Sequence, residues 1–91
     1  MSVTDVMKAL GDPVRWDLFI RIAARPEVGG TELGEAAAVS KPTMSYHLGV
    51  LRDAGLIQIR KQGRHHFYRV HREYGARVLA DARRRLKSQS S

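Results

Sequence analysis

The chain has 91 residues, of which 43% are hydrophobic, and it carries a formal net charge of +7. This length suits one folded domain and excludes a second lobe, while the apolar fraction excludes general disorder. The sequence contains no cysteine, which excludes disulfides, thiolate metal sites and thiol switches and makes a reducing cytoplasm the expected location.

The positive charge is concentrated in the middle and at the end of the chain. Residues 1–39 hold four Lys or Arg and six acids, residues 40–72 hold seven bases and one acid, and residues 73–91 hold five bases and two acids. Basic proteins of this size usually meet a polyanion, either nucleic acid or an acidic membrane surface. No apolar run approaches membrane-spanning length, and the N-terminus lacks the apolar core of a signal peptide. The charge distribution is the footprint of a docking face.

The first third of the sequence predicts two helices. Ser2 can cap a helix over residues 3–10, whose apolar residues recur at helical spacing. Asp12, followed by proline, can cap a second helix whose apolar face extends over residues 13–23. Residues 25–30 contain one proline and two glycines and predict a loop.

The middle of the sequence predicts a helix-turn-helix unit. Thr31 can cap a short helix over residues 32–38, and a brief turn follows. Ser40 can cap a fourth helix that begins near Pro42, and Gly55 stands where the glycine after a helix is expected. Two helices joined by a three-residue turn form a unit whose second helix can enter the major groove of DNA.

The last third predicts a hairpin and a final helix. Apolar residues alternate over residues 57–60 and 65–70, and the Lys-Gln-Gly sequence at residues 61–63 signals a turn between them. A last helix is predicted over residues 72–87, and residues 88–91 predict a disordered tail. The apolar stripe of this helix comprises Tyr74, Val78, Ala82 and Leu86.

This order of elements predicts a mainly α fold with a small β-hairpin, a winged helix-turn-helix of about five helices and a two-stranded wing in one domain over residues 1–87. The fourth helix would present Lys41, Thr43, Ser45 and Tyr46 at its start, where side chains reach base edges. The wing, residues 60–66, reads RKQGRHH, and its basic tip can follow phosphates or enter a narrow minor groove. Because each neutralised phosphate releases counterions, the affinity for DNA is expected to fall steeply with salt.

Three segments of the sequence carry a family pattern. Residues 9–15 read ALGDPVR, and residues 40–56 read SKPTMSYHLGVLRDAGL. In residues 63–70, Gly-Arg is followed by Phe-Tyr-Arg-Val. These segments resemble, in order, the opening motif, the recognition segment and the wing of the ArsR family of bacterial repressors. The match spans about Val6 to Val70. The three segments together are specific evidence for the resemblance, whereas any one of them alone would be weak evidence.

The resemblance implies a homodimer built from the first and last helices, with two recognition helices facing successive major-groove turns of an inverted repeat. It also implies DNA contacts from the start of the fourth helix and from the wing. The predicted DNA-binding residues are Lys41, Pro42, Thr43, Ser45, Tyr46, His47, Arg52, Lys61, Arg64 and His65. The predicted dimer interface comprises Val3, Met7, Leu10, Tyr74, Val78, Ala82 and Leu86.

The sequence departs from the family where many members sense metal. Those members use cysteines in the third helix or paired Asp and His ligands in the last helix. Here residues 31–38 contain no soft ligand, and the last helix has Glu73 and Asp81 but no histidine beyond His71. We therefore expect no metal site of the family's usual kind and no cofactor.

Several side chains have two interpretations. His65 and His66 suggest zinc, but neighbours on a strand point to opposite faces, which favours wing contacts or solvated histidines. His47 could contact DNA or hold the turn through a backbone hydrogen bond, and the structural role is favoured. Tyr46 could contact DNA or pack against the wing. Trp16 fits the core or a dimer interface better than a ligand pocket.

Two further features of the sequence stay open. Gly49 lies inside the fourth helix, where glycine is unfavourable, and close approach to a neighbouring helix or to DNA would explain it equally well. The three arginines at residues 83–85 are interpreted as the solvated face of the last helix.

Other classes of function are less well supported by the sequence. It contains no nucleophile with a positioned base, no paired carboxylates and no phosphate-binding glycine loop, so we do not expect an enzyme. A winged-helix protein-interaction module and a non-specific nucleic-acid binder are the alternatives, but a basic recognition helix and wing favour duplex DNA. We expect a sequence-specific, homodimeric transcriptional repressor, whose effector, if there is one, is a small molecule or a protein.

Overall fold

The computed structural model describes the backbone of residues 3–89 and the side chains of residues 6–85. Within these residues the chain forms five helices and one three-stranded sheet. In chain order the elements are α1 (Val3–Leu10), α2 (Pro13–Ala23), β1 (Val28–Gly29), α3 (Gly30–Ala37), α4 (Lys41–Asp53), β2 (Ile57–Gln62), β3 (His65–Val70) and α5 (Tyr74–Gln89). Among the described residues, no helix combines the length and the apolar character needed to cross a lipid bilayer.

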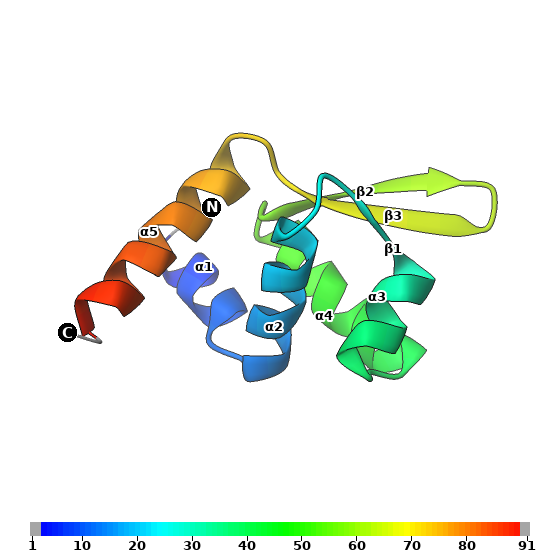
Figure 1. Ribbon diagram of the computed structural model, residues 1–91, viewed down its shortest axis with the longest axis horizontal. Coiled ribbons are helices and arrows are strands. Elements are labelled where there is room, and N and C mark those ends of the chain that lie inside the picture. The colour runs from blue at the N-terminus through cyan, green and yellow to red at the C-terminus, as the bar shows by residue number, and fades with distance from the viewer. Residues whose placement is uncertain (1–2, 90–91) are drawn as a thin grey trace.

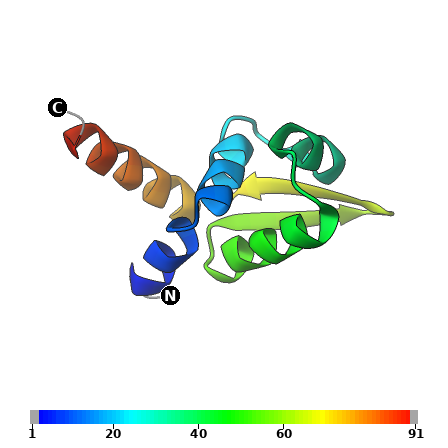
Figure 2. The same ribbon diagram turned by 90° about the horizontal axis from the view of Figure 1, so that it is seen from below.

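The winged helix-turn-helix arrangement predicted from the sequence is confirmed. Figure 1 shows the sheet along one side of the molecule, with α2, α3 and α4 packed beneath it. The β2–β3 hairpin extends beyond the helices as the wing, and α5 projects from the opposite end of the molecule, near α1. Figure 2 shows the same separation of the wing and α5 in a perpendicular view.

The sheet contains a strand that the sequence analysis does not predict. The prediction of a loop over residues 25–30 is wrong for Val28–Gly29. These two residues form β1 and pair antiparallel with Tyr68 and Phe67 of β3. A two-residue strand is too short to show alternation in the sequence, and it forms because the edge of β3 offers it a partner. The strand order is therefore β1-β3-β2.

The turn of the wing lies further along the chain than predicted. Gln62 is the last residue of β2 and pairs with His65, so the turn expected over residues 61–63 is wrong in position. The turn itself consists of Gly63 and Arg64. Gly63 has a φ of +61°, and glycine is favoured with this conformation at the first position of a two-residue hairpin turn. The shift places Arg64 at the tip of the wing.

Two predicted helix signals are confirmed in detail. The Asp12 carboxylate accepts hydrogen bonds from the backbone N–H groups of Val14 (2.8 Å) and Arg15 (3.0 Å) and so caps α2. These bonds, above all the one from Arg15, hold the pKa of Asp12 below its ordinary value. At the end of α4, Gly55 has a φ of +76° and donates its N–H to the Arg52 carbonyl (2.8 Å), which is typical of a glycine that ends a helix.

The predicted start of α3 is wrong. The helix begins at Gly30, with Gly29 at the N-cap position, and Thr31 lies inside the first turn rather than capping it. The reason is β1, which runs directly into α3 and leaves no room for a separate capping residue. The predicted cap of α1 at Ser2 lies outside the described residues.

The bounds of α5 also differ from the prediction. The helix begins at Tyr74, whose N–H donates to Nδ1 of His71 (3.3 Å), so the imidazole acts as the capping group. It continues to Gln89, and the tail predicted over residues 88–91 is therefore helical in its first two residues. Residues 90–91 lie outside the described part of the chain.

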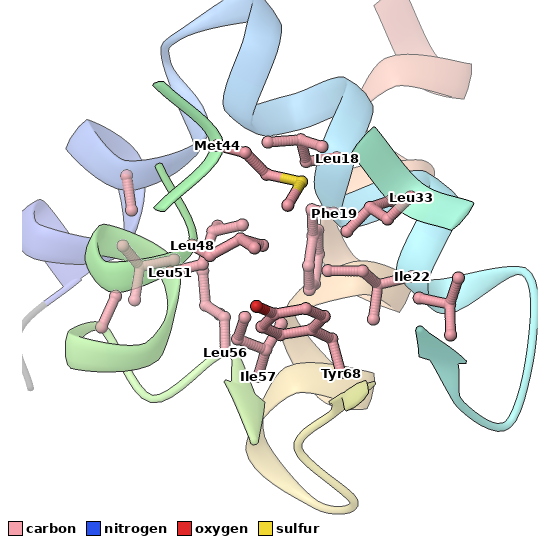
Figure 3. Packing of buried hydrophobic residues seen from close by; sticks show 14 residues of the cluster. Leu18, Phe19, Ile22, Leu33, Met44, Leu48, Leu51, Leu56, Ile57 and Tyr68 are labelled. Atoms are coloured by element: carbon pink, nitrogen blue, oxygen red, sulfur yellow. The ribbon is translucent and has the colours of Figure 1, made fainter. Parts of the chain in front are cut away.

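The core lies between the sheet and the helices (Figure 3). Helix α2 is central to it, since Leu18, Phe19 and Ile22 are fully buried. The other labelled core residues are Leu33, Met44, Leu48, Leu51, Leu56, Ile57 and Tyr68. Trp16 is half-buried against this cluster, with its ring centroid 6.3 Å from that of Phe19, which fits both the core and the dimer-interface interpretation.

Arg15 joins three helices at one point. Its Nε donates to the carbonyl of Ala9 (2.6 Å) and its Nη2 to the carbonyl of Lys8 (3.2 Å), both in the last turn of α1. Its Nη1 lies 3.4 Å from Nδ1 of His47 in α4. The ALGDPVR segment therefore has a structural basis, because its aspartate caps the start of α2 and its arginine caps the end of α1.

Candidate nucleic-acid interface

The first two turns of α4 expose the polar side chains expected to contact DNA. Five predicted residues are exposed there: Lys41, Pro42, Thr43, Ser45 and Tyr46. Met44 and Leu48, on the opposite side of the helix, are buried and fix its rotation against the core. Ser40 occupies the N-cap position, but its hydroxyl donates to Oγ1 of Thr43 (3.0 Å), so the predicted side-chain cap is wrong.

The polar side chains of the wing are either exposed or paired within the protein. Lys61, Arg64 and His65 are exposed, as a DNA contact requires. Arg60 instead forms two bonds to the Glu27 carboxylate, at 2.6 Å and 3.1 Å, and its guanidinium lies 4.5 Å from the centre of the Phe67 ring. Arg60 therefore fixes the wing to the segment before β1.

A groove of about 680 Å³ brings the two predicted contact regions together. Its walls include Lys41 and Ser45 from α4 and Arg64 and His65 from the wing. On the α3 side it is also lined by Glu35 and by Glu32, whose carboxylate pairs with Arg25. The start of α4 and the tip of the wing thus share one surface, and the cations on it are available to an outside anion.

Tyr46 and Arg52 lie apart from this groove. Tyr46 is 64% exposed and lines a smaller depression of about 340 Å³ between α1 and α4, together with Val50 and Lys8. Arg52 is exposed in the last turn of α4, with its Nε 3.1 Å from Oδ1 of Asp53. The exposed face of α4 therefore continues from its first turn to its last.

His47 differs from the other predicted DNA-binding residues because it is buried, with only 8% of its surface exposed. Its ring packs edge-on against Tyr46, with the ring centroids 5.2 Å apart. Since a guanidinium can only donate, a hydrogen bond between the two side chains requires Nδ1 of His47 as the acceptor, 3.4 Å from Nη1 of Arg15. The burial supports the structural alternative, but the partner is Arg15 rather than the backbone of the turn.

The histidines of the wing form no metal site that the described residues reveal. His65 and His66 are both exposed, and His66 packs edge-on against Tyr68, with Nδ1 3.5 Å from the Tyr68 hydroxyl. No group of three or more potential metal ligands occurs among the described side chains. Burial raises the pKa of Tyr68, so this hydroxyl stays protonated around neutral pH.

The predicted dimer residues occupy α1 and α5, at the end of the molecule opposite the wing. Met7 is 65% exposed, whereas Leu10, Tyr74 and Val78 are half-buried against the core of the same chain. Ala82 is half-buried as well. The side chains of Val3 and Leu86 lie outside the described part of the chain.

Two residues that organise this surface are absent from the sequence predictions, Glu27 and Arg15. Glu27 is 33 residues from Arg60, so no local pattern connects them. Arg15 falls within a recognised motif, but its 32-residue separation from His47 conceals the contact. Both contacts become visible only when the chain is folded.

The comparisons with known proteins agree with this fold. A helix-turn-helix domain family matches residues 10–60, the segment from the end of α1 into β2. The chain is 38% identical over 68 residues to the arsenic resistance transcriptional regulator ArsR1 of Pseudomonas putida, covering 75% of this chain and 53% of that protein. It is 34% identical over 78 residues to the biofilm growth-associated repressor of Agrobacterium fabrum, covering 86% and 66%. The chain thus spans between half and two-thirds of the length of these relatives.

A solved structure resembles nearly the whole chain. It is the homodimeric winged helix-turn-helix DNA-binding domain of a possible ArsR-family transcriptional regulator from Mycobacterium bovis. The TM-score is 0.83 at 27% sequence identity, over 93% of this chain and 78% of that one. The similarity therefore includes the wing and the terminal helices as well as the helix-turn-helix unit.

Proposed function

The chain belongs to the ArsR family of winged helix-turn-helix regulators, and on this premise we propose that it binds double-stranded DNA sequence-specifically as a homodimeric transcriptional repressor. The observation that carries the proposal is the groove shared by the start of α4 and the tip of the wing. Such a protein works where the chromosome lies, in the cytoplasm. The proposal assigns it no catalytic activity, in line with relatives named as regulators and repressors.

The shape of this surface fits a duplex. Helix α4 would enter the major groove by its start, where Lys41 and Ser45 reach base edges, while Arg64 at the wing tip would meet phosphates or an adjacent minor groove. We propose that nine of the ten predicted DNA-binding residues contact DNA. His47 is not among them, because its ring is buried against Arg15.

The test is selection of bound duplexes from a random pool, at two salt concentrations, followed by titration of the selected site. Arg64→Ala should weaken binding to all sequences and lower the dependence on log salt by about two units, because each protomer of the dimer loses one phosphate contact. Ser45→Ala should instead change the preferred bases while leaving the salt dependence unchanged.

Arg21→Ala is the matched control for Arg64→Ala. Arg21 is also an exposed arginine, but it lies on α2 and pairs with Asp17 (2.8 Å) away from the groove. The Arg21→Ala variant should bind the selected duplex with the same affinity as the parent protein. If Arg64→Ala and Ser45→Ala also bind like the parent, this docking surface is wrong, and if the parent selects no sequence at all, sequence-specific recognition is wrong.

The homodimer is proposed to form through α1 and α5. Both helices lie at the end opposite the wing, and Met7 of α1 leaves a large apolar side chain in solvent. Two-fold pairing there would hold two copies of α4 on one side of the dimer, which matches half-sites about one helical turn apart. The similar Mycobacterium bovis domain is itself homodimeric.

Sedimentation of the protein at tens of micromolar tests this assembly. The parent should sediment as a dimer, and Met7→Glu should shift it toward monomer because a charge would be buried in the interface. Val14→Glu is the control, since Val14 is another exposed aliphatic residue but lies on α2. A monomeric parent would remove the expectation of an inverted repeat.

A further inference from the structure

Gly49 lies in the middle of α4, and no contact within the described chain accounts for it. A Cβ built at this position would meet only Nη2 of Arg52, at 3.8 Å, which is an ordinary van der Waals distance. Glycine inside a helix is less stable than alanine, because it has more backbone freedom to lose. The sequence thus carries an unfavourable residue at a place where alanine would fit.

The other glycines in helices have closer neighbours within the chain than Gly49 has. At Gly34 a Cβ would lie 3.4 Å from the sulfur of Met44. At Gly30 it would lie 3.2 Å from the Tyr68 ring. At Gly75 it would collide with a backbone carbonyl. Of the two explanations for Gly49 open at the level of sequence, a neighbouring helix is therefore excluded within the described residues.

The position of Gly49 on the helix points to the remaining explanation. Gly49 follows Ser45 by four residues and Pro42 by seven, so it lies on the same face of α4 as these exposed residues and is itself half-buried. The guanidinium of Arg52 lies directly beside it; this side chain is more than half exposed, and its Nε pairs at the surface with Oδ1 of Asp53 (3.1 Å). A bare stretch of helix backbone next to a cation suits a phosphodiester strand, which needs close approach and a positive partner.

We propose that Gly49 marks the point where a sugar–phosphate strand of bound duplex DNA crosses α4, with Arg52 pairing to a phosphate beside it. The inference rests on the proposed DNA-binding function and adds the place of closest approach. A methyl group at residue 49 would hold the strand away from the helix. A phosphate is present in every sequence, so the effect should not depend on the bases.

The test combines thermal unfolding with titration of the selected duplex and of a scrambled duplex of the same length. Gly49→Ala should raise Tm by about 4–8 °C, since it restores helix propensity without a clash. It should also weaken binding roughly tenfold, and equally for both duplexes, because an added methyl in a close contact must be accommodated by displacement. Arg52→Ala should lower the salt dependence by about two units, one for each protomer of the dimer, whereas Gly49→Ala should leave it unchanged.

Ala36→Leu is the control for added bulk. Ala36 is exposed on α3 but does not line the groove, so Leu there should leave duplex binding unchanged, whereas Gly49→Leu should weaken it further than Gly49→Ala. A Gly49→Ala variant that binds both duplexes like the parent overturns the inference but leaves the proposed function intact. The inference is also overturned if binding falls for the selected duplex only, or if the variant becomes monomeric. A parent that binds neither duplex overturns the proposed function itself.

Discussion

The start of α5 and the outer face of α4 each place a glycine inside a helix, for opposite physical reasons. At Gly75 a Cβ would collide with the carbonyl oxygen of Leu56 and lie 2.8 Å from Cγ1 of Val70, so internal packing demands glycine. At Gly49 a Cβ would meet only the end of the Arg52 side chain, at 3.8 Å. One residue type in one kind of local structure thus serves the framework in one region and, in our proposal, the binding surface in the other. The same division predicts which substitutions change stability and which change DNA binding.

The largest expected effect is at Gly75. Gly75→Ala should lower the free energy of unfolding by about 3 kcal/mol, because the new Cβ must push α5 away from the backbone at Leu56. Urea unfolding measures this loss. Ala80→Gly, at an exposed position of the same helix, controls for helix propensity and should cost about 1 kcal/mol. Equal losses of unfolding free energy in the two variants would contradict the comparison between Gly75 and Gly49, because packing would then not explain the glycine at residue 75.

The next effect separates a framework cation from a surface cation. Arg15→Ala should lower the free energy of unfolding by about 2 kcal/mol, because it removes the donors that satisfy the last carbonyls of α1 and the partner of the buried His47. Lys41→Ala, in the exposed start of α4, should change it by about 0.5 kcal/mol or less. Duplex binding, measured under conditions in which both variants are fully folded, should be weakened more by Lys41→Ala than by Arg15→Ala. Similar losses of stability in both would contradict the division.

The parts of the fold that the sequence predicts are those whose causes are local. Asp12 caps its helix through atoms two and three residues away, and Gly55 ends α4 through its own φ angle. The alternation of β2 and β3 is likewise a property of consecutive residues. For the same reason the exposed start of α4 follows from helical periodicity, and the predicted surface at Lys41 and Ser45 is where the structure places it.

The parts that the sequence does not predict depend on residues far apart in the chain. β1 exists only because β3 lies beside it, and its presence moves the start of α3 from the residue after Thr31 back to Gly30. The burial of His47 depends on Arg15 in another helix. The basic wing shows the same limit, since counting charges treats Arg60 and Arg64 alike although, of the two, only Arg60 has a partner among the described side chains.

The smallest expected effect sharpens this contrast within the wing. The hydrogen bond from Arg60 holds the pKa of Glu27 below its ordinary value. A carboxyl group with a lowered pKa stabilises the fold at a pH above its unfolded pKa, and this contribution is lost as the pH falls through the folded value. At pH 7 the Tm of the parent protein should therefore be slightly higher than that of Glu27→Gln. The difference in Tm should shrink as the pH falls below about 4.3.

Thermal scans between pH 6 and pH 3, chosen to bracket the ordinary glutamate range of about 4.3, measure this convergence. Glu35→Gln, at an exposed position of α3, corrects for the loss of one negative charge from a basic protein. Added salt should reduce the difference at pH 7, because both partners of the ion pair are solvent-accessible. A Tm difference between parent and Glu27→Gln that persists unchanged at pH 3 would mean that the glutamate and glutamine side chains at residue 27 hold Arg60 differently for reasons other than charge. The wing would then be anchored by packing of Arg60 on Phe67 rather than by charge.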